Sequence, residues 1–292
     1  MSRSQPLRIA DPGRVHADLA HYWRDGYAVV RGFFDRAEIA ELSEALDQLY
    51  AEGIAHGRSF RHGNLFYNVA RGRDGEPLVR MVQWPSYHQP VLNRVRLDTR
   101  FAKLLEPLIG SDLKQIINQV HWKAPGSLGY FAWHQHSKSR RPPSANRNLA
   151  SAYVQTGLAI DPHGPEAGGM RFIPRSHLRG DLHMNCETHS LGAAMTDAAL
   201  DAVGLSAADA IDLVLEPGDL ALWSPYLVHG SGTNGSGHRR RFYVNGYVRA
   251  EDCDRGEWAF RGGKPVSFGP KAAVVHYEEL YERPEPHFVD DD

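Results

Sequence analysis

The chain has 292 residues, a formal net charge of -2 at pH 7 and 42% hydrophobic residues, which is enough to bury the core of one large β domain. The near-neutral charge excludes a strong overall attraction to nucleic acid or to an anionic membrane surface, so any anion-binding site must be local. Two cysteines are too few for a disulfide framework and no N-terminal apolar stretch resembles a signal peptide or membrane span, so we expect a reduced, cytoplasmic protein.

The N-terminal part of the chain is predicted to be mainly helical. Apolar residues recur at helical spacing from about Pro12 to Arg24, from Asp35 to Ala51 and from Arg100 to Ile109, where Gly110 follows as a C-terminal cap. Between the first two helices, the β-branched run Tyr27–Arg31 predicts a short strand.

The rest of the chain is predicted to be mainly β. Short runs rich in β-branched and aromatic residues alternate with Gly, Pro and Asp, a pattern typical of a β-sandwich or jelly roll. An alanine-rich, weakly helical segment, Leu191–Ala210, is expected to be an insertion over the mouth of the barrel. The predicted strands are Lys114–Lys123, Gly129–Gln135, Ala150–Ile160, Met170–Ile173, Asp212–Leu215, Leu220–Trp223 and Arg240–Arg249.

Three histidines are the strongest candidates for a metal site. His134 and His136 are separated by Gln135, so on a strand their side chains point the same way. Imidazole is a common ligand for iron, copper, zinc and nickel. His229, on a later strand, could supply a third ligand; the competing interpretation is that these are histidines of the core.

Several motifs in order resemble the phytanoyl-CoA dioxygenase-like family of iron(II)/2-oxoglutarate oxygenases, over about Tyr22 to Val248. The resemblance implies a double-stranded β-helix, that is, a cupin-like jelly roll, at about 114–250, with helices of about 12–110 packed on it and 251–292 as a C-terminal extension. We therefore expect residues 1–292 to form a single oxygenase domain. The motifs are Trp133-His134-Gln135, Gly168–His177, Pro217-Gly218-Asp219-Leu220, His229–Gly232 and the opening Arg24–Phe34.

One position departs from the family pattern. The family's first motif is His-x-Asp, whose carboxylate completes a two-histidine, one-carboxylate triad, whereas this chain has His136 there. A neutral imidazole leaves the metal site one unit more positive, which strengthens its attraction for an anionic co-substrate. His136 either binds the metal as a third histidine or faces the site without binding.

The resemblance also implies residues for the co-substrate. Arg240 stands where the family holds the far carboxylate of 2-oxoglutarate, which a guanidinium matches with two hydrogen bonds. Ser231 is the matching hydroxyl partner, and Lys123 corresponds to a lysine near the co-substrate. Strand alternation turns the neighbours of Arg240 away from whatever Arg240 faces; the competing interpretation is a solvated basic edge strand.

We expect a non-haem iron(II) oxygenase that couples decarboxylation of 2-oxoglutarate, using O2, to oxidation of a small metabolite, most simply by hydroxylation. The basic loop 137–147 follows the metal motif and favours an anionic substrate, although solvated loops are often basic. Two alternatives stay open: a three-histidine oxygenase that does not need 2-oxoglutarate, and an inactive binding protein of the same fold. The sequence identifies neither the substrate nor the oligomeric state.

Overall fold

The computed structural model describes residues 15–72, 74–126, 129–137, 140, 142–184, 195–273 and 283–289. Contacts divide the chain into two compact units. The first consists of Met1–Ile39, Ala124–Lys138 and Gln155–Arg240, and the second of Ala40–Lys123, Ser139–Val154 and Arg241–Asp292. Each unit has a buried core of its own, and the expectation of one domain over the whole chain stays a prediction.

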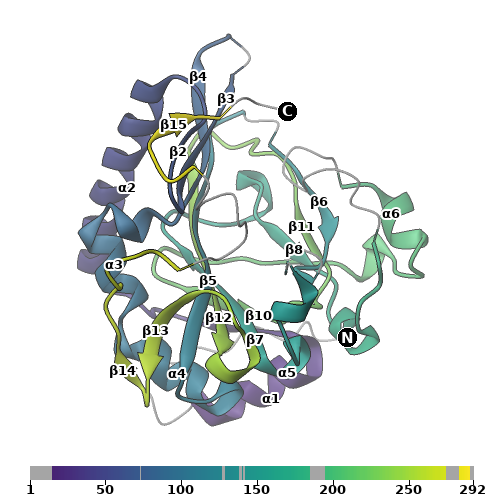
Figure 1. The fold of residues 1–292 in the computed structure, drawn as a ribbon. Helices are drawn as coiled ribbons and strands as arrows, with labels where there is room; N and C mark the ends of the chain where they lie inside the picture. The colour runs from purple at the N-terminus through teal and green to yellow at the C-terminus, as the bar shows by residue number, and fades with distance from the viewer. Residues whose placement is uncertain are drawn as a thin grey trace. The chain divides into compact units, whose positions relative to one another are not determined.

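Two antiparallel sheets form the first unit, and most of their strands are labelled in Figure 1. One sheet has the order β1 (Tyr27–Val30), β10 (Leu220–Trp223) and β7 (Tyr153–Ala159), which belongs to this unit from its third residue on. The other has the order β6 (Phe131–His134), β11 (His229–Ser231), β8 (Met170–Phe172) and β9 (Ile211–Asp212). The helical segments are α1 (Val15–Asp25), α6 (Asp197–Asp201) and the short 3-10 helices Pro165–Ala167, Ser176–Arg179 and Ala207–Asp209.

The two sheets of the first unit face each other across aromatic side chains. Trp223 of β10 lies with its ring centroid 5.9 Å from that of Phe172 of β8, and Phe172 lies 5.3 Å from Tyr27 of β1. Gly26, at φ +89°, turns the chain from α1 into β1, and a Cβ there would lie 2.5 Å from His177 Nδ1. Only glycine accepts both that conformation and that close approach.

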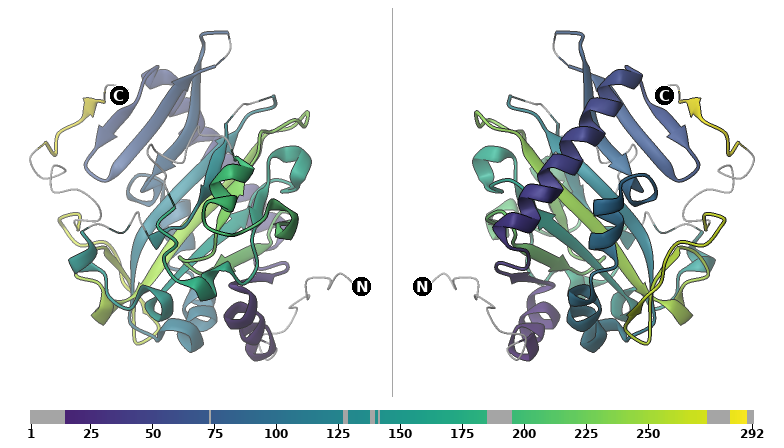
Figure 2. Two further views of the ribbon diagram at one scale, coloured as in Figure 1. Left: turned by 90° about the vertical axis from the view of Figure 1, so that its right-hand side faces the viewer. Right: turned by 90° about the vertical axis from the view of Figure 1, so that its left-hand side faces the viewer.

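The second unit is built on one antiparallel sheet. Its strand order is β12-β5-β4-β3-β2-β15, and β13 pairs with both β5 and β14. Helix α2 packs against it, because the Tyr67 hydroxyl of β3 donates a hydrogen bond to Glu52 and a Cβ on Gly53 would meet Val79 of β4; Figure 2 shows this long helix from two sides. The elements are α2 (Arg36–His56), β2 (Phe60–His62), β3 (Leu65–Arg71), β4 (Pro77–Gln83), α3 (Pro90–Arg96), α4 (Thr99–Ile109), β5 (Leu113–Lys123), α5 (Leu149–Ala152), β12 (Arg240–Arg249), β13 (Glu257–Arg261), β14 (Lys264–Pro265) and β15 (His287–Phe288), with 3-10 helices at Pro85–Tyr87, Pro143–Ala145 and Ala250–Asp252.

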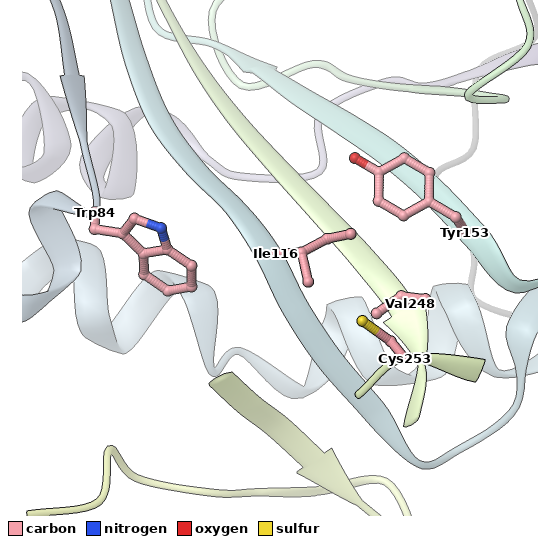
Figure 3. Close-up of a cluster of buried hydrophobic side chains, with 5 residues drawn as sticks. All are labelled: Trp84, Ile116, Tyr153, Val248 and Cys253. Atoms are coloured by element: carbon pink, nitrogen blue, oxygen red, sulfur yellow. The ribbon is translucent and has the colours of Figure 1, made fainter. Parts of the chain in front are cut away.

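A cluster of buried side chains forms part of the core of the second unit (Figure 3). Its five members are at most 2% exposed, and they come from segments far apart in the sequence. Burying each such side chain stabilises the fold by about 1.5–3 kcal/mol. Because Cys253 lies after β12 and Ile116 lies in β5, the cluster fastens the loop after β12 to the sheet. The members are Trp84, Ile116, Tyr153, Val248 and Cys253.

The mainly β architecture predicted from the sequence is confirmed, with differences at particular elements. Helix α4 ends at Ile109 with Gly110 as its cap, and β10 and β12 have the predicted bounds. The strand predicted at Asp212–Leu215 is shorter than expected, because β9 ends at Asp212 and Leu215 forms only an isolated bridge to His163. Strands β2, β3 and β4 were not expected, because turn-forming residues interrupt the stretch from Phe60 to Gln83. Residues 12–14 of the first predicted helix lie outside the described residues.

The segment predicted to cover the barrel mouth lies elsewhere. Residues 191–194 are outside the described residues, but Met195–Ala210 packs on Trp133 and Val228. These two residues precede His134 and His229, so their side chains point to the opposite face of the sheet. The prediction for the described part was therefore wrong: it covers the outer apolar face, and Figure 1 shows α6 outside β6 and β11.

Among the residues that the structure describes, no helix combines the length and the apolar character that crossing a bilayer requires.

Candidate metal centre

Strand pairing in the first unit brings the three candidate histidines together. His229 of β11 pairs with His134 of β6, and His136 follows two residues later on the same side. The ring centroids lie 4.1 Å apart for His134 and His229, and 4.6 Å apart for His136 and His229. One ring nitrogen from each residue lies within 4.8 Å of the other two. The register of two neighbouring strands therefore assembles the cluster.

Hydrogen bonds fix which ring nitrogen of each histidine faces the others. His134 Nδ1 donates to the Ala132 carbonyl at 2.7 Å, and His229 Nδ1 donates to the Leu227 carbonyl at 2.8 Å. His136 Nδ1 donates to Gln155 Oε1 at 3.1 Å. A neutral imidazole with its proton on Nδ1 has a lone pair on Nε2, so three lone pairs are directed into one space.

Burial keeps two of the three rings neutral. Desolvation lowers the pKa of His134, and it lowers the pKa of His229 well below the usual value; the repulsion that a protonated His134 would exert lowers the pKa of His229 further. Protonating either ring is therefore unfavourable. A cluster of buried, neutral imidazoles suits a cation, because metal ligands must be deprotonated.

The spacing of the nitrogens fits a transition-metal ion. His136 Nε2 and His229 Nε2 lie 3.1 Å apart. If both nitrogens bind one ion at right angles to each other, each nitrogen–metal bond is about 2.2 Å long. Typical zinc–imidazole bonds are of similar length, at about 2.0–2.1 Å. Without a cation, one Nε2 would have to carry a proton and give up the hydrogen bond made by Nδ1. The donor set thus fits a metal bound by three histidines.

Gln135, between the two ligand candidates, anchors their strand from the other side. Its buried side chain donates to the Tyr226 carbonyl at 2.6 Å and to the Gly180 carbonyl at 2.9 Å, and it accepts the Leu182 N–H at 2.9 Å. Gln135 directly follows β6 (Phe131–His134), so its anchored side chain fixes the backbone between His134 and His136.

Two aromatic side chains adjoin the cluster. The Trp223 ring centroid lies 5.8 Å from His229 and 6.1 Å from His136. The Phe172 ring lies 6.3 Å from His229. Because both aromatic side chains are buried, this side of the cluster is apolar and shielded from water.

The two residues predicted to hold a co-substrate carboxylate are also buried in the first unit. Ser231 lies two residues beyond His229 on β11 and pairs with Met170. Arg240, the first residue of β12, is 2% exposed, and burial lowers its pKa to about 10, whereas the charge of Asp161 acts to raise it. The predicted alternative of a solvated basic edge strand is therefore wrong for Arg240. A buried guanidinium of this kind attracts an anion.

Lys123 is placed differently from the other predicted residues. It is buried at the end of β5, which belongs to the second unit. Its role at the co-substrate stays a prediction.

The described arginines of the predicted basic loop interact within the second unit. Arg147 forms a salt bridge with Asp254 at 2.8 Å and donates to the Glu251 carbonyl at 2.6 Å. The guanidinium of Arg140 lies 5.5 Å from the Tyr153 ring centroid. Both contacts are structural, so these two arginines do not support the expected anionic substrate. Residues 138, 139 and 141 of the loop lie outside the described residues.

Two residues of the site were missed at the level of sequence. Gln155 of β7 accepts the His136 proton, and His163 lies with Nδ1 3.5 Å from Nη1 of Arg240. No local motif identifies either residue. The only available signal was in β7, where two polar residues, Gln155 and Thr156, stand within a fully buried run.

Comparison with known proteins points in one direction. The sequence profile of the phytanoyl-CoA dioxygenase (PhyH) family matches residues 22–242. The dioxygenase lolE1 of Epichloe uncinata is 25% identical over 233 residues, covering 78% of this chain and 80% of that protein. The probable alpha-ketoglutarate-dependent hypophosphite dioxygenase of Stutzerimonas stutzeri is 27% identical over 241 residues, covering 79% and 77%.

Solved structures agree on the fold. The epimerase SnoN from nogalamycin biosynthesis, in complex with Fe3+, alpha ketoglutarate and nogalamycin RO, matches with a TM-score of 0.60 and 22% identity, over 90% of this chain and 96% of that one. EctD from S. alaskensis, with 2-oxoglutarate and 5-hydroxyectoine, matches with a TM-score of 0.59 and 18% identity, over 94% and 90%. The predicted cupin-like jelly roll is confirmed.

Proposed function

The chain belongs to the phytanoyl-CoA dioxygenase family, and from this membership we propose that it hydroxylates a small metabolite at an iron(II) centre bound by His134, His136 and His229. It is an iron- and 2-oxoglutarate-dependent dioxygenase. The observation that carries the proposal is the cluster of three Nε2 lone pairs, each oriented by a hydrogen bond at Nδ1.

Iron(II) and 2-oxoglutarate, when bound, supply the oxidation: O2, 2-oxoglutarate and substrate give succinate, carbon dioxide and a product with one added oxygen atom. The protein contributes binding, orientation and exclusion of water. The three histidines hold the metal, and Gln135 keeps the strand of His134 and His136 in place. Arg240 and Ser231 hold the far carboxylate of 2-oxoglutarate. Trp223 and Phe172 exclude water on their side of the cluster.

The missing carboxylate at position 136 changes the charge at the centre. Three neutral imidazoles leave both charges of a divalent ion uncompensated, so attraction for the dianionic co-substrate is stronger than with a carboxylate ligand. This favours retention of 2-oxoglutarate chemistry. The buried cation of Arg240 supports the same conclusion, because a scaffold without a ligand gains nothing from a desolvated guanidinium.

The test measures succinate and O2 together. Protein loaded with iron(II) is mixed with 2-oxoglutarate, aerated buffer and a panel of small metabolites, including carboxylates, phosphonates and neutral compounds. We expect one succinate per O2 consumed, a rate that rises with the right metabolite, and transfer of one atom from 18O2 into the product. A surface variant, His62→Ala, serves as the matched control and is expected to behave as the wild type.

Each alternative has its own signature in this experiment. O2 uptake that needs iron and a substrate but is indifferent to 2-oxoglutarate would replace the proposal with a three-histidine oxygenase whose substrate binds the metal directly. Failure of the protein to bind iron would replace it with a binding protein of the same fold. A product that has lost two hydrogens without gaining oxygen would keep the enzyme class and overturn hydroxylation.

A further inference from the structure

Another histidine of the first unit, His163, lies outside the metal cluster and beside Arg240. His163 is 1% exposed. Its backbone N–H donates to the Leu215 carbonyl at 2.9 Å, and its carbonyl accepts the Leu215 N–H at 2.9 Å. This paired backbone fixes the position of His163 although no regular strand contains it.

The proton of the His163 ring can be assigned from one contact. The backbone N–H of Met170 donates to His163 Nε2 at 2.9 Å. A backbone amide can only donate, so Nε2 carries a lone pair and the proton of the neutral ring is on Nδ1. Met170 also pairs with Ser231 across β8 and β11, which brings His163 to the strand of the predicted co-substrate serine.

The assigned proton points toward another donor. His163 Nδ1 lies 3.5 Å from Arg240 Nη1, and a guanidinium has five N–H donors and no acceptor. A hydrogen bond directly between the two groups is therefore ruled out by this tautomer. An acceptor with two oxygens, such as a carboxylate, can bind both donors at once. The negative charge would also offset the cost of burying Arg240.

The turn after His163 packs tightly around its ring. A Cβ at Gly169 would lie 2.7 Å from the Gly164 carbonyl oxygen and 3.1 Å from His163 Cδ2. Gly168 has φ +65°, and a Cβ there would lie 2.6 Å from the Thr233 carbonyl oxygen. These approaches require glycine, and Gly169 lets the backbone pass close to the His163 ring.

We propose that His163 Nδ1–H is a further donor, beside Arg240 and Ser231, to the far carboxylate of 2-oxoglutarate, and that Arg240 and His163 together select 2-oxo acids with a second carboxylate. The inference rests on the proposed function and goes one step further, because it assigns a residue and a basis for co-substrate selectivity. The guanidinium contributes charge and paired hydrogen bonds, and the imidazole N–H adds a donor from another direction.

Two variants separate this role from a structural one. In His163→Gln, the amide oxygen reaches the position of Nε2 and can accept the Met170 N–H, but no donor remains at the position of Nδ1. In His163→Asn, the amide nitrogen occupies the position of Nδ1 as a donor, but the acceptor for Met170 is lost. The measurement is the Kd of anaerobic iron(II)-loaded protein for 2-oxoglutarate and for 2-oxopentanoate, which has a methyl group in place of the far carboxylate.

We expect His163→Gln to raise the Kd for 2-oxoglutarate by about ten- to a hundredfold, the range for losing a hydrogen bond to a charged group, and to leave the Kd for 2-oxopentanoate within about twofold. His163→Asn should have the smaller effect on 2-oxoglutarate. Iron binding should be the same in both variants and the wild type, because His163 is not in the metal cluster.

The opposite order, with His163→Asn more impaired than His163→Gln, would overturn the inference and leave His163 as a support for Met170. Equal weakening of both 2-oxo acids would overturn it too. If wild-type protein binds iron but not 2-oxoglutarate, the proposed function itself fails. If His163→Gln binds 2-oxoglutarate as tightly as the wild type does, the role of His163 is contradicted, but the proposed function is not.

Discussion

His136 Nε2 lies 3.1 Å from His229 Nε2, although the two residues are 93 positions apart in the chain. Each ring is held from behind, His136 by the Gln155 side chain and His229 by the Leu227 carbonyl. Such outer partners orient metal-ligating histidines and make them more basic. The contact therefore places an imidazole at the position where the family has a carboxylate, with the support expected of a ligand.

Removing one ligand should abolish stable metal binding. We expect His229→Ala to weaken iron(II) binding by more than about a hundredfold, since loss of only an outer-shell partner costs 10–100-fold. Metal analysis after desalting measures the bound iron. The control His62→Ala changes an exposed histidine of β2 and should retain one iron per chain; iron retained by His229→Ala would contradict the assignment.

The charge at position 136 should control co-substrate affinity. His136→Asp adds a negative charge next to the metal, and His136→Asn has nearly the same shape without the charge. We expect 2-oxoglutarate to bind roughly tenfold more weakly to the Asp variant than to the Asn variant, since about 1.4 kcal/mol of charge repulsion is sufficient. Anaerobic titration measures both Kd values. Tighter binding by the Asp variant would show that the imidazole impairs this step.

Arg240 should reduce the stability of the ligand-free protein. Burial lowers its pKa to about 10, which means that the fold disfavours its charge. Replacing such a group by an apolar residue of similar length is often stabilising, so Arg240→Met should raise the free energy of unfolding by about 1 kcal/mol. Urea denaturation measures this. 2-Oxoglutarate should raise the Tm of iron-loaded wild type but not of Arg240→Met. A large loss of stability would instead make Arg240 a structural residue.

Metal-free protein should lose stability in mild acid. Burial lowers the pKa of His134 and His229 in the folded state, whereas in the unfolded chain both are near 6.5. Below about pH 6.5 the unfolded state binds more protons than the folded state, so the free energy of unfolding falls as pH falls. Urea denaturation at several pH values measures the slope. A double variant, His134→Phe with His229→Phe, should have a shallower slope; an unchanged slope would assign the effect to other groups.

Much of the fold was predictable because local patterns decided it. The cap at Gly110 and the apolar runs of β10 and β12 gave the observed bounds, since propensity and burial agree there. Strands β2 to β4 were not predicted because pairing with neighbouring strands, and not local sequence preference, forms them. Their turn-forming residues resemble loop sequence. The described part of the segment Leu191–Ala210 was predicted on the wrong face, because its packing partners, Trp133 and Val228, are recognisable as outward-facing only from strand alternation next to His134 and His229.

The candidate site was predictable only where a motif marked it. His134, His136, His229, Ser231 and Arg240 stand in recognisable local contexts, and the structure places all five in one unit. His163 lies in a turn, and Arg240, which it contacts, is 77 positions away in the chain. Its importance arises from the tautomer that the Met170 amide imposes, and no spacing rule expresses that relationship.

The most direct test of the central claim is an anaerobic titration. Iron(II) and then 2-oxoglutarate are added to metal-free protein, and the visible charge-transfer band of a metal-chelated 2-oxo acid is followed. We predict a saturable band in the wild type, a band that requires much higher 2-oxoglutarate in Arg240→Met, and none in His229→Ala. Iron bound in the wild type without any band would contradict the claim that this three-histidine centre uses 2-oxoglutarate.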